Sequence, residues 1–183
     1  MKSSVDDFSA IEAYEHHSVI CIDHDPFTIQ VATHVADLLR TRMPSLRVEH
    51  IGSTAVPGCA GKGIVDVAVI YPAGELEAAR ALVDSLGFQH QPQRDPFPED
   101  RPMRVGVLRC TGRKYFLHVH VVAADSPEVA RLLKFRDRLR ADSALRDAYV
   151  ACKRKLLAAG ITDSLDFCMA KGDFIEAVIQ DRR

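Results

Sequence analysis

Residues 48–69 read VEHIGSTAVPGCAGKGIVDVAV, and this stretch decides the fold of a chain of 183 residues. A short extended segment at 46–51 leads into a glycine-rich connection over 52–63, and the run IVDVAVIY follows at 64–71. A nearly continuous series of Val and Ile is typical of a strand that is buried on both faces. The stretch therefore predicts two strands joined by a glycine-rich loop, with Asp66 inside the second strand.

The chemistry of this stretch centres on one carboxylate and one loop. Burying the lone carboxylate of Asp66 is costly unless it is paired or hydrogen-bonded, so it has a partner or lines an active cleft. Gly52 and Ser53 begin a segment whose backbone N–H groups, with the hydroxyls of Ser53 and Thr54, can bind a phosphate that Lys62 would neutralise. A phosphate-binding cleft and a structural turn beside a hydrogen-bonded aspartate both stay open.

The remaining elements follow from hydrophobic spacing and from Gly and Pro signals. Helices are expected at 26–41, 75–86, 126–140, 143–160 and 163–180, and a hairpin joins strands 103–109 and 114–122 through Thr111 and Gly112. Residues 1–18 are expected to form a loosely attached arm and residues 89–102 a mobile surface loop. The order predicts an α/β (α+β) fold, in which 1–24 are an N-terminal arm and 25–183 a single domain with a mixed sheet and a C-terminal helical part.

Composition and charge exclude several classes of protein. The chain has 24 Lys and Arg against 25 Asp and Glu, so no whole-molecule field attracts nucleic acid or an anionic membrane. No apolar run approaches the ~20 residues of a membrane span, and the acidic N-terminus resembles no targeting peptide. Five scattered cysteines without a CxxC motif indicate reduced thiols and a cytoplasmic location. Residues 126–183 carry 12 Lys and Arg against 9 Asp and Glu, which permits one cationic wall beside a site.

Two histidines share one face of a predicted strand. His118 and His120 are two residues apart, so their side chains point the same way. If this strand neighbours Asp66, the three side chains converge. They could then hold Zn²⁺, Mn²⁺ or Fe²⁺, act in acid–base chemistry or contact substrate, or form a structural polar cluster. Glu49 and His50 precede the Gly-Ser pair, and Glu49 could orient a histidine.

The C-terminal helices offer candidate phosphate ligands. Arg136 and Arg140 are four residues apart and share one helix face, and Lys153 lies on the next helix. They could clamp a phosphate against the Ser53 loop, or form a solvated face that pairs with neighbouring carboxylates. The cysteines are expected to be small core residues, with Cys59 the one in the loop.

The chain resembles the GrpB family, a branch of the nucleotidyltransferase superfamily. The superfamily pattern is a Gly-Ser pair followed by a strand with acidic residues, matched here by Gly52, Ser53 and Asp66. The GrpB block is matched by EHIGSTAVPG at 49–58 and GKGIVD at 61–66, where Ala and Pro are usual at the two glycine positions. Later matches are LHVHV at 117–121, FRDRLR at 135–140, Tyr149, Lys153 and KGDFI at 171–175, so the resemblance covers roughly residues 26–180.

The resemblance implies a nucleotidyltransferase-like fold and a divalent ion, Mg²⁺ or Mn²⁺, held by Asp66. The second acidic position is Ala68, as an apolar residue is usual there in GrpB proteins. A single carboxylate holds Mg²⁺ weakly, so two-metal transfer is in doubt. The chain also lacks a P-loop, so it is not the dephospho-coenzyme A kinase to which GrpB-type domains are sometimes fused.

The sequence therefore predicts a protein that binds a nucleotide or another phosphorylated small molecule, with nucleotidyl transfer as the implied activity. Gly52, Ser53, Thr54, Lys62, Arg136 and Lys153 are the predicted substrate-binding residues, and Asp66, His118 and His120 the catalytic and metal-binding ones. The alternative is a ligand-binding or regulatory module that kept the fold but lost catalysis, as Ala68 suggests. A role near coenzyme A metabolism is a third reading.

Overall fold

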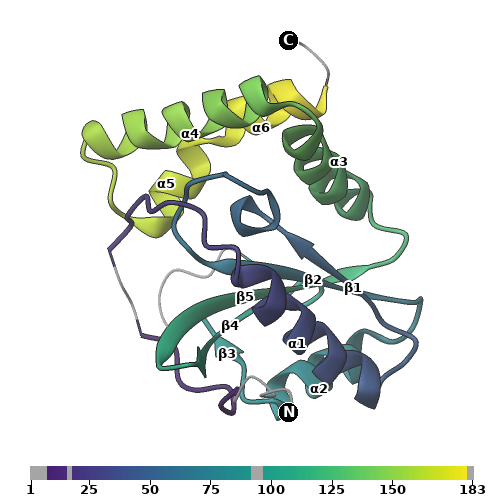
Figure 1. The fold of residues 1–183 in the computed structure, drawn as a ribbon. Helices are drawn as coiled ribbons and strands as arrows, with labels where there is room; N and C mark the ends of the chain where they lie inside the picture. Colours follow the sequence, from purple (N-terminus) through teal and green to yellow (C-terminus); the bar gives the residue numbers. More distant parts are fainter. Residues whose placement is uncertain (1–7, 16–17, 92–96, 181–183) are drawn as a thin grey trace.

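The computed structural model describes residues 8–15, 18–91 and 97–180, which form a five-stranded mixed sheet between two groups of helices (Figure 1). The strands are β1 (Arg47–Ile51), β2 (Val65–Tyr71), β3 (Gln89–His90), β4 (Met103–Cys110) and β5 (Arg113–Ala123). Their spatial order is β1-β2-β5-β4-β3. Strands β2 and β5 run parallel and the other neighbouring pairs are antiparallel. The predicted mixed sheet flanked by helices is confirmed.

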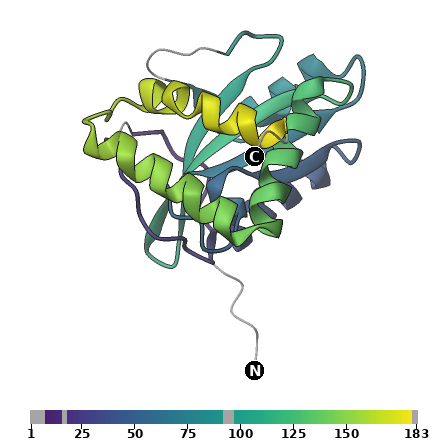
Figure 2. The same cartoon turned by 90° about the horizontal axis from the view of Figure 1, so that it is seen from above.

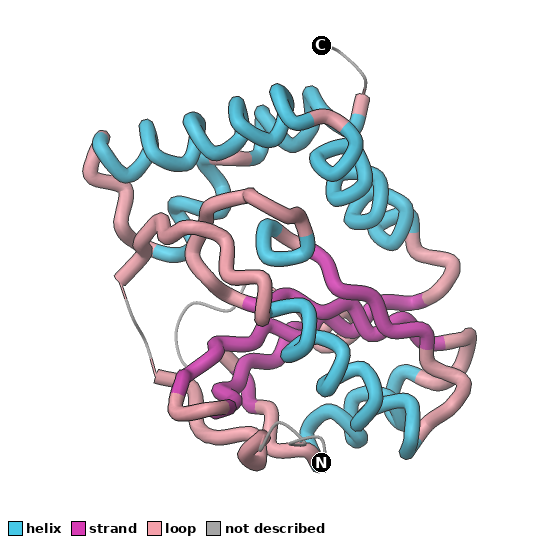
Figure 3. The backbone as a smooth tube through the Cα atoms, in the orientation of Figure 1, coloured by secondary structure: helices cyan, strands magenta, loops and turns pink. Residues whose placement is uncertain are grey.

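Helices cover both faces of the sheet (Figure 3). On one face lie α1 (Thr28–Arg42) and α2 (Leu76–Ser85). On the other lie α3 (Pro127–Ala141), α4 (Ser143–Ala158), α5 (Ser164–Ala170) and α6 (Gly172–Ile179). Ser126 caps α3, and Asp142, the residue before the expected start of α4, caps α4, because its carboxylate accepts a hydrogen bond from the Leu145 N–H. Within the described residues, no helix has both the length and the apolar character of a membrane span.

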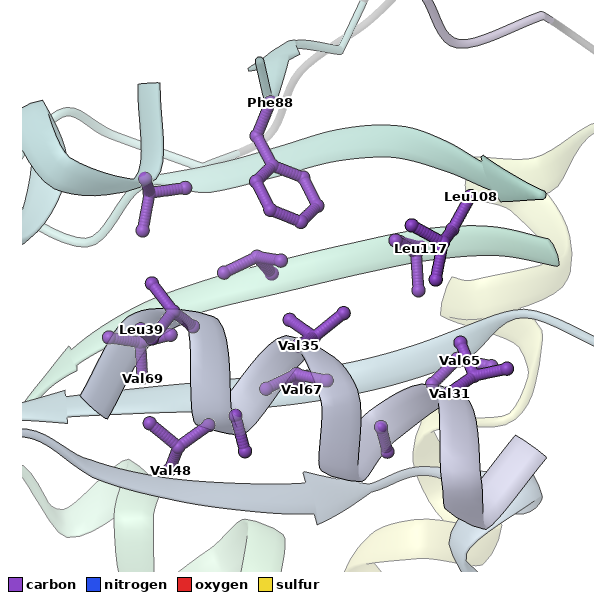
Figure 4. Packing of buried hydrophobic residues seen from close by; sticks show 14 of the residues in the cluster. Val31, Val35, Leu39, Val48, Val65, Val67, Val69, Phe88, Leu108 and Leu117 are labelled. Carbon is purple, nitrogen blue, oxygen red and sulfur yellow. The ribbon is translucent and has the colours of Figure 1, made fainter. Parts of the chain in front are cut away.

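The main hydrophobic core lies between the sheet and α1 and α2. Side chains alternate between the two faces along a strand, so one set from β2 and β5 packs against these helices. Figure 4 shows this packing, whose central members are all buried: Val31, Val35, Leu39, Val65, Val67, Val69 and Leu117. The alternate set, which contains Asp66, Ala68, His118 and His120, consequently lies on the face toward α3–α6.

The C-terminal helices pack on that second face and on the glycine-rich loop. Ala68 and Ile70 of β2 form a small buried cluster with Ile51, and Leu132 and Leu133 of α3 pack against it. A further cluster joins loop residues to the helices; it contains Val56, Cys59, Ala60, Leu139, Leu145, Tyr149, Val150 and Val178. Figure 2, seen from above, shows α4 and α6 lying over the sheet. The loop at 52–63 is thus held between the sheet and the C-terminal helices.

The N-terminal segment is attached more firmly than the sequence predicts. Phe8 and Glu12 form antiparallel bridges with Cys110 and Val107 of β4, and Phe8 packs against the main core. Further along, the backbone of Ile22 exchanges hydrogen bonds of 2.8 and 2.9 Å with Gly61. The prediction of a loosely attached arm is therefore wrong for residues 8–15, because they pair with the edge of β4. His16 and His17 lie outside the described residues.

Two other expectations need correction. The helix expected over 163–180 is two helices, α5 and α6, which meet at Lys171 and Gly172. Glycine is a poor helix former, and Lys171, which lies between the two helices, is buried. The surface loop expected over 89–102 begins with the short strand β3, which pairs with Arg104 and Val105 of β4; residues 92–96 lie outside the described part of the chain.

The hairpin between β4 and β5 is confirmed. Thr111 and Gly112 both have positive φ angles, 51° and 76°, which is the backbone conformation of a tight type I′ turn. This turn aligns β5 with β4, and β5 then runs parallel to β2. His118 and His120 are thereby brought to the strand that carries Asp66.

Candidate functional site

The Gly-Ser turn lies directly against the carboxylate of Asp66. Gly52 follows β1 with φ 70°, and Ser53 begins the short 3-10 turn η1 (Ser53–Ala55). A Cβ atom at position 52 would lie 2.3 Å from Oδ2 of Asp66. Only glycine has both the required φ and the required space, so its place in the pattern follows from the approach of the backbone to the carboxylate.

Asp66, His118 and His120 converge as the sequence analysis anticipated. Asp66 pairs with His118 in the parallel register of β2 and β5, and Oδ1 of Asp66 lies 3.5 Å from Nδ1 of His118 and 3.8 Å from Nε2 of His120. The three side chains are 25%, 14% and 19% exposed. Burial raises the pKa of Asp66, but the two imidazoles and Lys62 outweigh it and hold that pKa below its ordinary value. The carboxylate is thus ionised and partnered.

The second acidic position of the superfamily pattern is filled by an apolar residue. Ala68 lies opposite His120 in the register, is 1% exposed and belongs to the apolar cluster under α3. The nearest substitute is Glu49, which pairs with Ala68 from β1. The carboxylate of Glu49 instead accepts hydrogen bonds of 2.9 Å from Arg47 and 2.8 Å from Arg136. One carboxylate, Asp66, therefore faces this part of the sheet from β2.

A magnesium ion does not fit this donor set. Mg²⁺ prefers oxygen ligands and keeps near-ideal octahedral geometry, whereas Asp66 is surrounded by two imidazoles. Among the residues that the structure describes, no group of three or more His, Cys, Asp and Glu side chains is arranged to hold a metal ion. The arrangement is a carboxylate that faces two imidazoles at 3.5 and 3.8 Å.

Two aromatic residues that the sequence analysis missed flank the histidines. The hydroxyl of Tyr14 lies 3.5 Å from Nε2 of His118, and burial together with the charge of Asp66 raises the pKa of Tyr14 to about 12. On the other side, the ring of Phe97 stands edge-on to His120 with centroids 5.4 Å apart. Both come from segments that the sequence analysis treated as loop or arm, where no pattern indicates contact with a site.

Lys153 reaches the Gly-Ser turn from α4. Its side chain is 1% exposed, and its Nζ donates hydrogen bonds to Oγ of Ser53 at 3.0 Å and to the carbonyl of Ala60. Cys59 Sγ lies 3.5 Å away, and the ring of Tyr149 lies under the ammonium at 4.4 Å. Burial lowers the pKa of Lys153. The structure therefore brings two predicted substrate-binding residues, Ser53 and Lys153, into direct contact.

Lys171 and Lys62 lie close enough to Lys153 to form what we call the lysine cluster. Lys171 is 8% exposed, and its Nζ lies 4.7 Å from the ring centroid of Phe167. Burial lowers the pKa of Lys171 to about 8, and the charges of Lys62 and Lys153 push it the same way. Lys62 donates a 3.0 Å hydrogen bond to Oγ of Ser164. Lys171 was missed as a site residue because its depth depends on the break between α5 and α6.

No carboxylate within the described residues forms an ion pair with a member of the lysine cluster. The partners of Lys62 and Lys153 are hydroxyl, carbonyl and thiol groups and an aromatic ring, and Lys171 has an aromatic ring alone. Asp66 lies near enough for its charge to act on Lys62 and Lys171, but outside ion-pair distance. The cluster is consequently a concentration of positive charge that no carboxylate among the described residues pairs with.

Other predicted ligands lie in structural networks. The hydroxyl of Thr54 is buried, donates to the carbonyl of Ile64 at 3.0 Å and contacts Nε2 of His50 at 3.0 Å. Burial, helped by the charges of Arg140 and Arg136, lowers the pKa of His50 to about 4, so this imidazole is neutral. Thr54 thus fastens the turn to β1 and to the start of β2.

The two arginines of the predicted clamp form contacts within the protein. Arg136 donates to Glu49 at 2.8 Å, to the carbonyl of His50 at 3.0 Å and to Asp137 at 2.7 Å. Arg140 donates to the carbonyl of Ala55 at 2.8 Å. Helical spacing placed both arginines on one face, as expected, but that face fastens α3 to β1 and η1.

Comparison with known proteins shows the family of this chain. The family model described as GrpB protein matches residues 18–181. The chain belongs to the GrpB family. A UPF0157 protein of Streptomyces coelicolor is 37% identical over 131 residues, which are 72% of this chain and 66% of that relative. A UPF0157 protein of Halalkalibacterium halodurans is 26% identical over 166 residues, which are 89% and 82% of the two chains. This GrpB chain thus spans slightly under two thirds of the first relative.

Solved structures share the fold. The crystal structure of GrpB from Enterococcus faecalis superimposes with a TM-score of 0.69 at 28% identity, over 88% of this chain and 96% of that one. Terminal uridylyl transferase 4 from Trypanosoma brucei has a TM-score of 0.50 at 16% identity, over 86% of this chain and 53% of that one. The second likeness concerns the fold alone, and it confirms the predicted nucleotidyltransferase-like class.

Gly61 and Gly63 stand where Ala and Pro are usual in the GrpB block, and close contacts explain both glycines. A Cβ atom at Gly61 would lie 3.1 Å from Cβ of Ser53 and 3.2 Å from Nζ of Lys153. Gly63 has φ +75°, which proline cannot adopt, and Ile22 lies where its Cβ would be. These two glycines therefore leave room for Lys153 and Ile22 at close range.

Proposed function

We propose that this GrpB protein binds a nucleotide or another phosphorylated small molecule at the lysine cluster of Lys62, Lys153 and Lys171, beside Ser53. The observation that supports this is the set of three ammonium groups, two of them buried, for which the described residues provide no carboxylate partner. A phosphorylated ligand would supply the missing negative charge. In this proposal the hydroxyl of Ser53, which contacts Lys153, donates a hydrogen bond to the same phosphate.

The energetic reason is the cost of burying charge. A buried ammonium costs several kcal/mol unless a counter-charge and hydrogen bonds offset that cost. Lys171 shows the cost in its lowered pKa, and its neighbours Lys62 and Lys153 add repulsion. A protein that needed these residues only for packing would be more stable with apolar side chains at the same positions. A binding role explains why the charges are kept.

The fold favours a nucleotide as the first ligand to test. The Trypanosoma brucei transferase that shares the fold is described with bound dUTP. In this GrpB protein the equivalent proposal places the phosphates at Lys153, Lys171 and Ser53, with Asp66 and the histidines beside them.

Nucleotidyl transfer is the second candidate, and the convergence of Asp66, His118 and His120 supports it. In such a step an acceptor oxygen would bond to the α-phosphorus, pyrophosphate would leave, and an imidazole would take the acceptor's proton. Ala68 supports the opposite reading, a binding module without catalysis. Release of pyrophosphate from a nucleoside triphosphate, lost in His118→Gln, would favour transfer over binding alone.

Binding is tested by calorimetry and thermal unfolding with triphosphate, ATP and UTP. Lys153→Met and Lys171→Met are each expected to weaken binding by about tenfold or more, since a charge-assisted contact contributes roughly 1.5–3 kcal/mol. Lys155→Met is the matched control, because Lys155 is exposed on the same helix as Lys153. Equal affinities in the Lys153→Met and Lys155→Met proteins, or no binding by the unaltered protein at millimolar ligand, would contradict the proposal.

A further inference from the structure

We infer that this site takes its phosphorylated ligand free of divalent metal ions, and that the lysine cluster supplies the positive charge that a metal would otherwise provide. This inference rests on the proposed function and specifies the chemical form of the ligand. It departs from the divalent ion that the family resemblance implied, and three observations support it.

The first observation is the state of the Asp66 carboxylate. Its Oδ1 faces both imidazoles, at 3.5 and 3.8 Å, and its Oδ2 lies against the backbone of Gly52. His118 is engaged at both ring nitrogens, since Nδ1 faces Asp66 and Nε2 faces the hydroxyl of Tyr14 at 3.5 Å. A neutral imidazole with Nδ1–H toward Asp66 and Nε2 toward the hydroxyl of Tyr14 satisfies both partners, so a metal ion at His118 would have to displace one of them.

The second observation is the lack of additional carboxylate ligands. Mg²⁺ in phosphate sites is usually held by one or two carboxylates together with the phosphates. Here the residue two positions after Asp66 is the buried Ala68, and Glu49 in the neighbouring strand is held by Arg47 and Arg136. Recruiting Glu49 would break its ion pair with Arg136, whose side chain is 11% exposed.

The third observation is the balance of charge. Lys62, Lys153 and Lys171 bring three positive charges, and Asp66 is the carboxylate whose charge acts on both Lys62 and Lys171. A divalent ion at Asp66 would add two more positive charges and increase repulsion within the cluster. A metal-free phosphate or polyphosphate would neutralise the excess positive charge of the cluster without adding that repulsion.

The test compares the same ligands with and without metal. Triphosphate and ATP are titrated into the unaltered protein in EDTA, in MgCl2 and in MnCl2. Binding is expected in EDTA, and excess Mg²⁺ is expected to weaken it by roughly threefold to tenfold, because a metal-bound phosphate chain carries less negative charge. Binding that requires metal, or that is about tenfold tighter with it, would overturn the inference while leaving the proposed function in place. Absence of binding in every buffer would overturn both.

Asp66→Asn is a second test, because metal-dependent binding and metal-free binding predict opposite changes in ligand affinity. If Asp66 held a metal, the variant would lose ligand binding. If the lysines bind the phosphate directly, the variant binds at least as tightly in EDTA, since a negative charge beside the site is removed. Asp37→Asn is the control, because Asp37 is exposed on α1, on the opposite face of the sheet. The EDTA comparison uses the unaltered protein, so it decides the matter even if Asp66→Asn folds poorly.

Discussion

Nζ of Lys153 lies 3.0 Å from Oγ of Ser53, a contact that joins α4 to the turn after β1 across 100 residues of sequence. The contact places an ammonium and a hydroxyl side by side at the end of the Gly-Ser turn, and Gly61 leaves the space that the lysine needs. Since hydroxyl and ammonium groups can both donate to one phosphate, this pair is the centre of the proposed binding site.

Ser53→Ala tests the pair from the side of the turn. The variant is expected to lose about 1 kcal/mol of unfolding free energy, the usual net value of one hydrogen bond, and to weaken triphosphate binding by several fold. Chemical denaturation and calorimetry measure the two effects. The matched control is Ser45→Ala, which removes an exposed hydrogen bond to Glu75 far from the cluster. An unchanged affinity in Ser53→Ala would mean that the hydroxyl serves structure alone.

Gly52→Ala tests the close approach of the turn to Asp66. The added methyl group would lie 2.3 Å from Oδ2 of Asp66 in a backbone with positive φ, so strain and overlap together should cost about 3 kcal/mol of stability. Gly74→Ala has the same backbone requirement, φ +82°, but nothing within 4 Å of the new Cβ, and should cost only about 1 kcal/mol. Urea denaturation of the two variants measures both losses of unfolding free energy. Equal losses would show that the carboxylate of Asp66 moves away from the new methyl group at little cost.

Lys171 predicts how binding depends on pH. Its pKa in the ligand-free protein is lowered to about 8, so the ammonium is charged below pH 8 and loses its proton above it. Affinity for triphosphate should therefore be flat below about pH 7.5 and fall as the pH rises through 8. Calorimetry at pH 7 and pH 9 measures the change.

The same residue predicts the sign of a change in stability. An unfolded chain keeps the Lys171 proton up to an ordinary pKa of 10.5, whereas the folded protein releases it near pH 8. The unfolded state therefore binds more protons between these values, and the stability of the ligand-free protein rises with pH across that window. Lys171→Met should remove both pH effects. If the variant keeps the same profile for affinity and stability, another group is responsible.

Much of the fold could be predicted because its signals are local. The Val-rich run around Asp66, the turn at Thr111 and Gly112 and the helix caps at Ser126 and Asp163 each depend on a few adjacent residues, and the structure shows all of them. The side-by-side placement of Asp66 and His118 needed more, because parallel pairing of two strands is a long-range property. The sequence analysis could therefore state that pairing only as a condition.

The remaining parts of the site depend on how deeply side chains are buried and on where neighbouring segments of the chain lie. A single sequence gives no direct signal for either. Lys171 is buried at the break between α5 and α6, and continuous helical spacing gave no sign of that break. Tyr14 reaches His118 because Phe8 and Glu12 form bridges with β4, although residues 1–18 were expected to form a loosely attached arm. Arg136 was placed correctly on a helix face, but helical spacing does not say that Glu49 lies opposite.

His50 predicts a loss of stability in acid. Burial lowers its pKa to about 4, below the ordinary value of 6.5 that applies to the unfolded chain. Between these values the unfolded state binds a proton that the folded state does not, so stability falls as the pH drops from 6.5 toward 4. The contribution should be about 2 kcal/mol after allowance for partial exposure. His50→Gln, which cannot titrate, should flatten this part of the curve in denaturation experiments between pH 4 and pH 7.

Arg136→Gln separates the two roles considered for this arginine. The guanidinium is 11% exposed and fastens α3 to β1 through Glu49 and the carbonyl of His50. Its loss leaves the carboxylate of Glu49, itself 24% exposed, with Arg47 as the remaining cation, so unfolding free energy should fall by about 3 kcal/mol. Glu49→Gln should cost a similar amount, and the double variant should cost less than the two single costs together, because the partners are coupled. Triphosphate affinity should fall less in Arg136→Gln than in Lys153→Met. A larger fall would instead place Arg136 at the ligand, as the helix spacing first suggested.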